Sequence, residues 1–388
     1  MVEIRLILPR DLTFLSNILY EGLLFSLLHS PTEFDGTVLK VPNDFIIRAI
    51  EELDYKRIEG LRITMSGNDN INRTLFEKYG ISDQSRKTFY DLLSKVKDHA
   101  NGFIIGRNEI VLGIEFKGRK MVIDVEELAV PQLLKVDRYT GISSLETKYT
   151  SQQITVYSSK EIMLIALLGI YSSFVTSVRQ QNQQYYFFLS LSPEEIEFLL
   201  SNLNDRELLK KIFRTKEHVI RILSEILNKT TLNELILLEI YLNVEIRRQM
   251  EESNLDKISL ILFKISPEGQ TYKVYEFVPI TIYREGFVFH EVVKRYYKAE
   301  RFLEDLSRAL DPNGVIFDAL KNLNKYDEAN NVLKAVCGLY RFIVLGNADG
   351  WYEFIREITN AYKKLESSMK PKEKVRRKKY MDLVRMFT

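Results

Sequence analysis

The sequence predicts an α+β protein in which a mixed N-terminal α/β body with antiparallel strands is followed by a C-terminal helical bundle. Alternating apolar and polar residues, typical of strands, recur up to about residue 280. From residue 290 onward, apolar residues instead recur at steps of three and four, as in amphipathic helices. The 388 residues, of which 45% are hydrophobic, are enough to bury a large core.

The first 155 residues mix helices and strands. Helices are expected over 11–28, with Asp11 as a cap, and over 42–53. Lys117-Gly118-Arg119 predicts a hairpin turn. Short β-favouring segments predict strands over residues 2–8, 103–105, 109–116, 120–125 and 147–157.

The middle of the chain begins with an apolar helix expected over 159–177. Pro193 follows Ser192, and this order suits the first turn of a helix. Two strands, 258–265 and 271–278, are expected later around a Pro-Glu-Gly turn. Between them, periodicity predicts helices over residues 193–203, 205–213, 216–227 and 232–250.

The remainder of the chain is expected to be helical, with breaks at 311–314 and 346–350. We therefore expect two domains. The first spans 1–290 and carries a helical insertion around 193–250, and the second is a bundle over 291–388 with a basic tail. The expected helices of the second domain cover residues 290–310, 315–323, 326–345, 351–365 and a basic segment at the end.

Motifs of known chemistry are absent from the sequence. The four histidines and the single Cys337 have no metal-ligand spacing, and no phosphate-binding loop or nucleophile motif occurs. We therefore expect no enzyme activity, no cofactor and no metal. One cysteine, no signal-peptide pattern and no apolar stretch long enough to cross a bilayer predict a cytoplasmic protein away from membranes. The composition, rich in Lys, Glu and Ile and poor in Cys, is typical of a thermophile.

Positive charge is concentrated at the C-terminal end. The net charge is +2, yet residues 363–388 carry ten Lys or Arg against three Asp or Glu. Such a tail either contacts an anionic partner, with nucleic acid favoured over membrane, or is only a solvated surface. The candidate nucleic-acid contacts are Lys372, Lys374, Arg376, Arg377, Lys378 and Lys379. The same helix has an apolar face that could instead dock a protein partner, formed by Tyr380, Leu383, Val384 and Phe387.

Two further segments offer polar contacts for nucleic acid. In the helix expected over 290–310, Lys294, Lys298 and Arg301 share a stripe that either follows phosphates or is a solvated face diluted by acids. Amide side chains contact base edges, phosphates and sugars, and tyrosines stack on unpaired bases, but the same residues also suit an exposed connection before an aromatic strand. The amide-rich candidates are Arg179, Gln180, Gln181, Asn182, Gln183 and Gln184.

Several stretches resemble a known family. They are TGISSLETKYTSQQITVYSS, GIYSSFV, YYFFLSLSPEEIEFLL and, near the end, LYRFIVLGNADGWYEFIREI. About 60 central residues and 20 near the end resemble the CRISPR-associated large subunit of archaeal subtype I-A surveillance (Cascade-like) complexes.

The resemblance implies a non-catalytic subunit of an RNA-guided antiviral complex. Such a subunit recognises the motif that flanks the target in duplex DNA, stabilises the R-loop and helps recruit the helicase-nuclease. Its expected partners are guide RNA, target DNA, the other subunits and the helicase-nuclease. Base pairing to the guide supplies sequence specificity in such complexes, which agrees with basic stripes and no recognisable active site. The alternatives are a protein–protein scaffold and a DNA-binding protein without a guide RNA.

Overall fold

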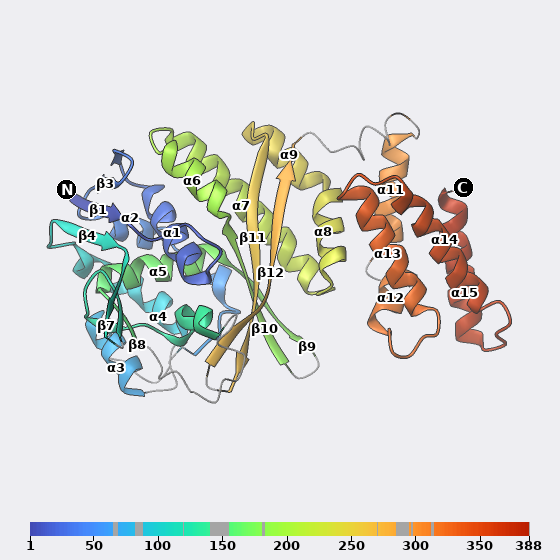
Figure 1. Ribbon diagram of the computed structural model, residues 1–388, viewed down its shortest axis with the longest axis horizontal. Helices are drawn as coiled ribbons and strands as arrows, with labels where there is room; N and C mark the ends of the chain where they lie inside the picture. The colour runs from blue at the N-terminus through green and yellow to red at the C-terminus, as the bar shows by residue number, and fades with distance from the viewer. Residues whose placement is uncertain are drawn as a thin grey trace. The chain divides into compact units, whose positions relative to one another are not determined.

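The computed structural model has an α+β fold, as the sequence predicts (Figure 1). The structure describes residues 1–64, 69–81, 88–118, 120–139, 155–180, 183–269, 271–284, 295, 298–311 and 314–387. The chain divides into two compact units. The first unit comprises 1–220 and 258–281, and the second comprises 221–257 and 282–388. Residues 221–257, assigned by the sequence prediction to the first domain, group instead with the C-terminal helices.

Three four-stranded sheets form the framework of the first unit. Their strand orders are β2-β3-β1-β4, β5-β6-β8-β7 and β12-β11-β10-β9. Most neighbours are antiparallel, but β1 pairs in parallel with β4 and β6 with β8. The strands of the first two sheets are β1 (Val2–Leu6), β2 (Glu33–Phe34), β3 (Val38–Val41), β4 (Glu109–Leu112), β5 (Ile114–Lys117), β6 (Lys120–Ile123), β7 (Leu128–Ala129) and β8 (Thr155–Ser158).

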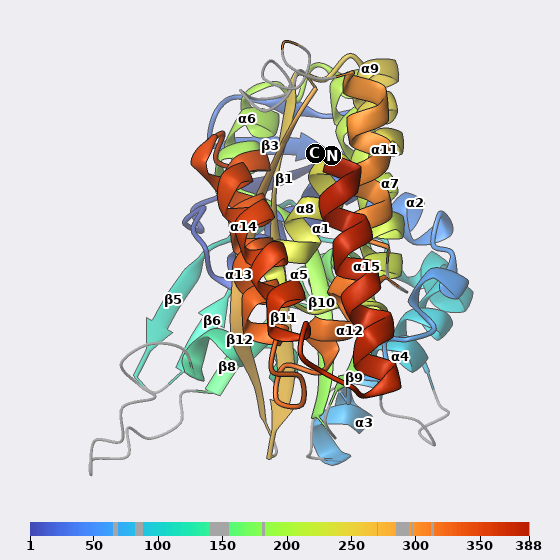
Figure 2. The same ribbon diagram turned by 90° about the vertical axis from the view of Figure 1, so that its right-hand side faces the viewer.

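The third sheet contains the longest strands (Figure 2). It consists of β9 (Phe174–Gln180), β10 (Gln183–Leu191), β11 (Lys257–Glu268) and β12 (Thr271–Tyr283). The aromatic run that follows the amide segment lies in β10, beside β11, where β-favouring residues pack well. Phe188 of this run makes edge-to-face contacts with Phe14 and Phe174, so one face of the sheet meets the helical core.

Two apolar helices, α1 (Phe14–Leu27) and α5 (Lys160–Ser173), pack against each other in the first unit. They cross at Gly22 and Gly169. A Cβ atom at Gly22 would lie 1.8 Å from the backbone oxygen of Ile165, and one at Gly169 would lie 1.9 Å from that of Ile18. Only glycine therefore allows the two backbones to approach this closely.

Further helices complete the first unit. Ser192 caps α6 by accepting a hydrogen bond from the Glu195 backbone, and Pro193 occupies its first turn as predicted. The remaining helices in the described part of the unit are α2 (Phe45–Glu51), η1 (Tyr55–Ile58), α3 (Asp69–Lys78), α4 (Phe89–Val96), η2 (Lys97–Phe103), η3 (Gln132–Tyr139), α6 (Pro193–Ser201) and the beginning of α7 (Arg206–Leu227).

The second unit is a helical assembly around one apolar core that includes Trp351, Phe354 and Tyr380. Its helices α13 and α14 cross at a second glycine pair, where a Cβ at Gly350 would lie 2.3 Å from the backbone oxygen of Gly338. Gly350 belongs to the Gly-Asn-Ala-Asp-Gly break, which joins two helices as the sequence predicts. Among the described residues, the helices that lie wholly within this unit are α8 (Asn233–Leu242), α9 (Val244–Ser253), α11 (Ala299–Ala309), α12 (Val315–Lys321), α13 (Ala329–Ile343), α14 (Asp349–Lys364) and α15 (Pro371–Phe387).

Several element predictions need correction in the first unit. Residues 103–105 form no strand, because Ile105 donates its backbone N–H to Asn43 in a connection. The strand expected over 109–116 breaks at Gly113 into β4 and β5, which belong to different sheets. Asp11 is not the cap of α1. Thr13 occupies that position, and Asp11 accepts hydrogen bonds from its backbone and hydroxyl.

Helix lengths also differ from the predictions. The helix expected over 159–177 ends at Ser173, where the chain becomes extended and enters β9. The helices expected over 205–213 and 216–227 form the continuous α7. The helix expected over 232–250 breaks at Asn243, whose side chain caps α9. Of the strand expected over 147–157 and the helix expected over 290–310, parts lie outside the described residues, and the described parts are β8 and α11.

Candidate nucleic-acid interface

The basic helix α15 buries one side and exposes the other. It begins at Pro371, where proline suits a first helical turn. Tyr380 and Leu383 are buried, and Val384 and Phe387 pack against the same core. The Phe387 ring contacts the rings of Phe302, Trp351 and Phe354. The apolar face proposed for partner docking is therefore used inside the second unit, which corrects that interpretation.

Arg376 also faces inward. Its Nε atom lies 2.7 Å from Oε1 of Glu328, whose side chain is fully buried, and its guanidinium stacks 3.7 Å from the ring centroid of Tyr326. Partial burial opposes the charge, but the hydrogen bond and the carboxylate of Glu328 outweigh it and raise the pKa of Arg376. Burial and the Glu328 charge likewise raise the pKa of the Tyr380 hydroxyl. Arg376 thus anchors α15 to the helices before it.

Arg377 is partly engaged as well, because its guanidinium donates a hydrogen bond to the backbone oxygen of Glu366, 2.8 Å away. Lys370, the residue before α15, pairs with Glu373 in the first turn of the helix at 3.1 Å. These contacts tie the beginning of α15 to the connection that precedes it. The guanidinium of Arg377 is therefore partly occupied by a contact within the second unit.

The outward face of α15 carries cations without ion pairs in the described part of the chain. At 100° per residue, Lys374, Lys378 and Arg385 fall within one narrow stripe, opposite Tyr380. All three are exposed, and Asp382 is an exposed acid near them. Arg385 was not among the candidates from the sequence, although a spacing of seven residues from Lys378 puts both on the same side of a helix. We define the cationic face of α15 as Lys374, Lys378 and Arg385. Lys372 and Lys379 are also exposed, but at 100° per residue they lie on a different side of the helix.

We expect replacement of Arg376 by alanine to destabilise the second unit, because it leaves the buried Glu328 carboxylate without its counter-charge. The free energy of unfolding should fall by roughly 3 kcal/mol. Chemical denaturation followed by circular dichroism measures this change. The matched control is Arg385→Ala on the same helix, which should change stability by less than about 0.5 kcal/mol. Equal stability of the two variants would contradict the anchoring role.

The basic stripe of α11 is neutralised by acids on the same helix. Arg301 lies 3.9 Å from Asp305, and Arg308 lies near both Asp305 and Glu304. Lys298 is exposed at the residue before the helix, and Lys294 lies outside the described residues. The described part of this stripe is therefore closer to a solvated face than to a phosphate track, because its arginines are paired.

The amide-rich segment lies at the tip of the β9–β10 hairpin. Arg179 and Gln180 end β9 and are exposed, whereas Gln183 and Gln184 begin β10 and are half-buried. Gln181 and Asn182 lie outside the described residues. The amide of Gln183 donates hydrogen bonds to the hydroxyls of Ser266 at 3.0 Å and Tyr275 at 2.9 Å. All four described residues of this segment thus belong to the third sheet, and two of them, Gln183 and Gln184, are half-buried in it.

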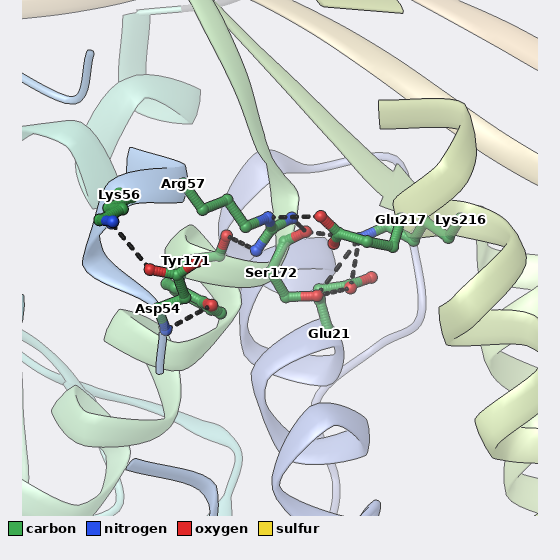
Figure 3. A network of polar contacts seen from close by, with 8 residues as sticks. All are labelled: Glu21, Asp54, Lys56, Arg57, Tyr171, Ser172, Lys216 and Glu217. Carbon is green, nitrogen blue, oxygen red and sulfur yellow. Dashed lines mark hydrogen bonds and ion pairs between the residues drawn. The ribbon is translucent and has the colours of Figure 1, made fainter. Parts of the chain in front are cut away.

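A buried polar network lies where α5 passes into β9, and it was not predicted from the sequence (Figure 3). Lys216 from α7 donates to a carboxylate oxygen of Glu21 at 2.6 Å, and to the backbone oxygen of Ser172 at 2.8 Å. The Ser172 hydroxyl donates to Glu21 at 2.5 Å, and the other Glu21 oxygen accepts from the Leu191 backbone at 3.1 Å. The Lys216 and Glu21 side chains are 1% and 0% exposed. Burial lowers the pKa of Lys216 despite the neighbouring charge of Glu21.

The network caps the C-terminal end of α5. The last turn of a helix leaves carbonyl oxygens without partners, and α5 has no basic residue of its own there. Arg57 donates to the carbonyl of Tyr171 at 2.6 Å and to that of Ser172 at 2.8 Å, while Lys216 reaches Ser172 from the other side. Arg57 also pairs with Glu217 at 2.9 Å. Arg57 and Lys216 thus satisfy the last carbonyl groups of α5, and β9 can begin at the next residue, Phe174.

In some enzymes a lysine of lowered pKa acts as the base that activates a neighbouring serine hydroxyl as a nucleophile, so Ser172 and Lys216 raise that possibility. Here the Ser172 hydroxyl is bonded to Glu21, and Ser172 is only 3% exposed. The contacts account for the network as a helix cap and not as a reactive centre. Within the described ranges, no cluster of three His, Cys, Asp or Glu could hold a metal ion. No helix in that part of the chain is long and apolar enough to cross a membrane.

Comparison with known proteins gives one informative relationship. No family model matches the sequence, and no solved structure matches it. An uncharacterized protein of Archaeoglobus fulgidus is 49% identical over 394 aligned residues, covering 99% of each chain. Identity at this level over the full length requires a shared fold, so the chain belongs to the same family as this archaeal protein.

Proposed function

We propose that this protein binds nucleic acid as the non-catalytic large subunit of an RNA-guided DNA surveillance complex. The observation that carries the nucleic-acid role is the cationic face of α15, whose three cations have no ion pairs in the described part of the chain. Exposed lysines and arginines in a row follow the phosphates of duplex DNA and release its counterions. The assignment to a surveillance complex rests on the resemblance to subtype I-A large subunits.

In this role the protein recognises the target-flanking motif, stabilises the R-loop and helps to recruit the helicase-nuclease. Base pairing between guide RNA and target supplies sequence specificity, so the subunit needs backbone contacts more than an active site. Its partners are guide RNA, target DNA, the other subunits and the helicase-nuclease, in the cytoplasm. A protein–protein scaffold is less favoured, because the docking face suggested for it packs into the core.

We expect the triple variant Lys374→Ala, Lys378→Ala and Arg385→Ala to bind duplex DNA more weakly. The slope of log affinity against log salt should fall by about 0.9 for each phosphate that the variant no longer neutralises. Fluorescence anisotropy with a labelled duplex, repeated across a salt series, measures both quantities.

The matched control removes cations that are ion-paired, through Arg301→Ala and Arg308→Ala on α11. These changes should leave the salt slope near that of the wild type. Arg376→Ala, measured per folded molecule, should also keep its affinity, since its guanidinium faces inward. A triple variant with an unchanged slope would remove α15 from DNA binding.

The guide-RNA assignment has a separate test. The tagged full chain is purified from cells of its source organism, and the co-purifying nucleic acid is sequenced. The proposal expects short RNAs with a uniform 5′ end, together with other subunits of the complex. DNA binding without such RNAs would instead identify a DNA-binding protein that acts without a guide.

A further inference from the structure

The hairpin of β5 and β6 presents an exposed strand at the edge of the second sheet (Figure 2). Within the described ranges, only β6 pairs with β5, and all four residues of β5 are exposed. Phe116 is 67% exposed and Ile114 is 37% exposed. The two share one face of the strand, because side chains alternate between faces. An edge strand of this kind is a template for pairing with a further strand.

The backbone of β5 turns the hydrogen-bonding groups of Ile114 and Phe116 to the free edge. Lys117 lies opposite Lys120 across a two-residue turn, and such a turn is closed by a hydrogen bond between its flanking residues. Lys117 therefore directs its backbone groups toward β6, and by the alternation of an antiparallel pair Glu115 does the same. The N–H and C=O groups of Ile114 and Phe116 then point away from β6, toward the edge.

The charges of β5 are complementary to those of an identical strand. Glu115 and Lys117 lie on the face opposite Phe116, and Nζ of Lys117 is 3.0 Å from Oε2 of Glu115 in the same strand. Charged side chains on an edge strand usually deter pairing with other chains. One acid and one base two residues apart instead allow pairing where each charge meets its opposite.

The positions of these charges select one register. Two identical strands that pair antiparallel about a two-fold axis place residues at equal distances from the axis opposite each other. With the axis at Phe116, Glu115 lies opposite Lys117 of the second copy, and Lys117 lies opposite its Glu115. An axis at Glu115 or at Lys117 would instead bring like charges together. The axis at Phe116 also suits the backbone, because this residue has its N–H and C=O at the free edge.

We propose that β5 pairs with β5 of a second copy of this chain, antiparallel and in the register centred on Phe116. The two Phe116 rings then lie opposite each other on one face, and two pairs of Glu115 with Lys117 lie on the other. Ile114 lies opposite Gly118 of the second copy, where an added Cβ would meet no described atom within 4 Å. This inference goes beyond the nucleic-acid role proposed above and does not rest on it.

Sedimentation velocity of the purified, nuclease-treated full chain tests this pairing. A contact of this small size is expected to give a dissociation constant in the micromolar range, so the wild type should pass from monomer to dimer between about 1 μM and about 200 μM. Glu115→Lys and Lys117→Glu each place like charges opposite each other at two positions. Each variant alone should dimerise at least about tenfold more weakly than the wild type.

Charge reversal on both sides should restore the dimer. An equal mixture of the Glu115→Lys and Lys117→Glu variants should associate, because every facing pair then has opposite charges. The double variant Glu115→Lys with Lys117→Glu should dimerise like the wild type for the same reason. Phe116→Ala should weaken the dimer about fivefold through loss of the aromatic pair.

Phe198→Ala is the matched control, because it removes a ring that is 47% exposed on α6, outside the hairpin, and it should leave the dimer unchanged. A wild type that stays monomeric across the whole range overturns the proposal. A dimer that Glu115→Lys leaves intact also overturns it, since the two copies would then meet through another surface. Failure of the two charge variants to associate when mixed overturns the register centred on Phe116.

Discussion

Replacing Gly169 with alanine is expected to lower the free energy of unfolding by about 3 kcal/mol or more. The added Cβ would lie 1.9 Å from the backbone oxygen of Ile18, far inside the normal separation of two such atoms. The obstacle is backbone and not a flexible side-chain tip, so α1 and α5 must separate to admit the methyl group. Because Gly22 faces the same crossing from α1, Gly22→Ala should have a similar effect.

Thermal or urea unfolding followed by circular dichroism measures this change in stability. Gly102→Ala and Gly106→Ala are the matched controls, because a Cβ at either position meets no atom within 4 Å. Alanine restricts the unfolded chain at such positions, so these controls should match or slightly exceed the stability of the wild type. If the Gly169→Ala variant has the same free energy of unfolding as the controls, the close helix crossing does not exist in solution.

Glu21→Ala should destabilise the first unit by about 3–5 kcal/mol, because it leaves the Lys216 ammonium buried without a counter-charge. It also removes the acceptor of the Leu191 N–H and of the Ser172 hydroxyl. Urea unfolding measures the change. The control Glu207→Gln breaks an exposed pair with Lys210 and should cost less than about 1 kcal/mol.

The pH dependence separates a buried charge from a simple packing defect. Burial lowers the pKa of Lys216 in the folded state, so the unfolded state binds more protons below the ordinary lysine pKa. Stability from this group therefore rises with pH, and Glu21→Ala should regain part of its stability between about pH 7 and about pH 10. Glu21→Gln with Lys216→Met has no buried ammonium and should lack this recovery. A pH-independent destabilisation in Glu21→Ala would contradict the assignment.

The sequence predicted the element types well where a pattern was long. The helices α12, α13 and α14 and the strand pair β11–β12 follow directly from periodicity, and the helix start at Pro193 follows from its chemistry. Predictions failed where a neighbour distant in sequence decided the outcome. The apolar helix ends at Ser173 because Arg57 and Lys216 bind its last carbonyl groups, and no local residue signals that end.

The sequence predicted the location of the candidate site, but not which of its side chains are exposed. The concentration of positive charge at the end of the chain and the presence of an amphipathic helix there needed no structure. Periodicity, however, shows only which residues share a face. It treated Arg376 and Lys378 alike, although Arg376 bonds Glu328, 48 residues away, and Lys378 is exposed.

The sequence by itself therefore determined the α+β class, most of the helices and the basic character of the tail, because these depend on neighbours within a few turns. Tertiary structure alone decided which cations are exposed, which glycines permit close helix crossings and which aromatic residues remain at the surface. The physical reason is that ion pairing and burial depend on contacts between segments far apart in the chain. Glu21 and Lys216 show this most clearly, since each is an ordinary charged residue in its own helix and becomes part of a buried pair only when α1, α5 and α7 pack together.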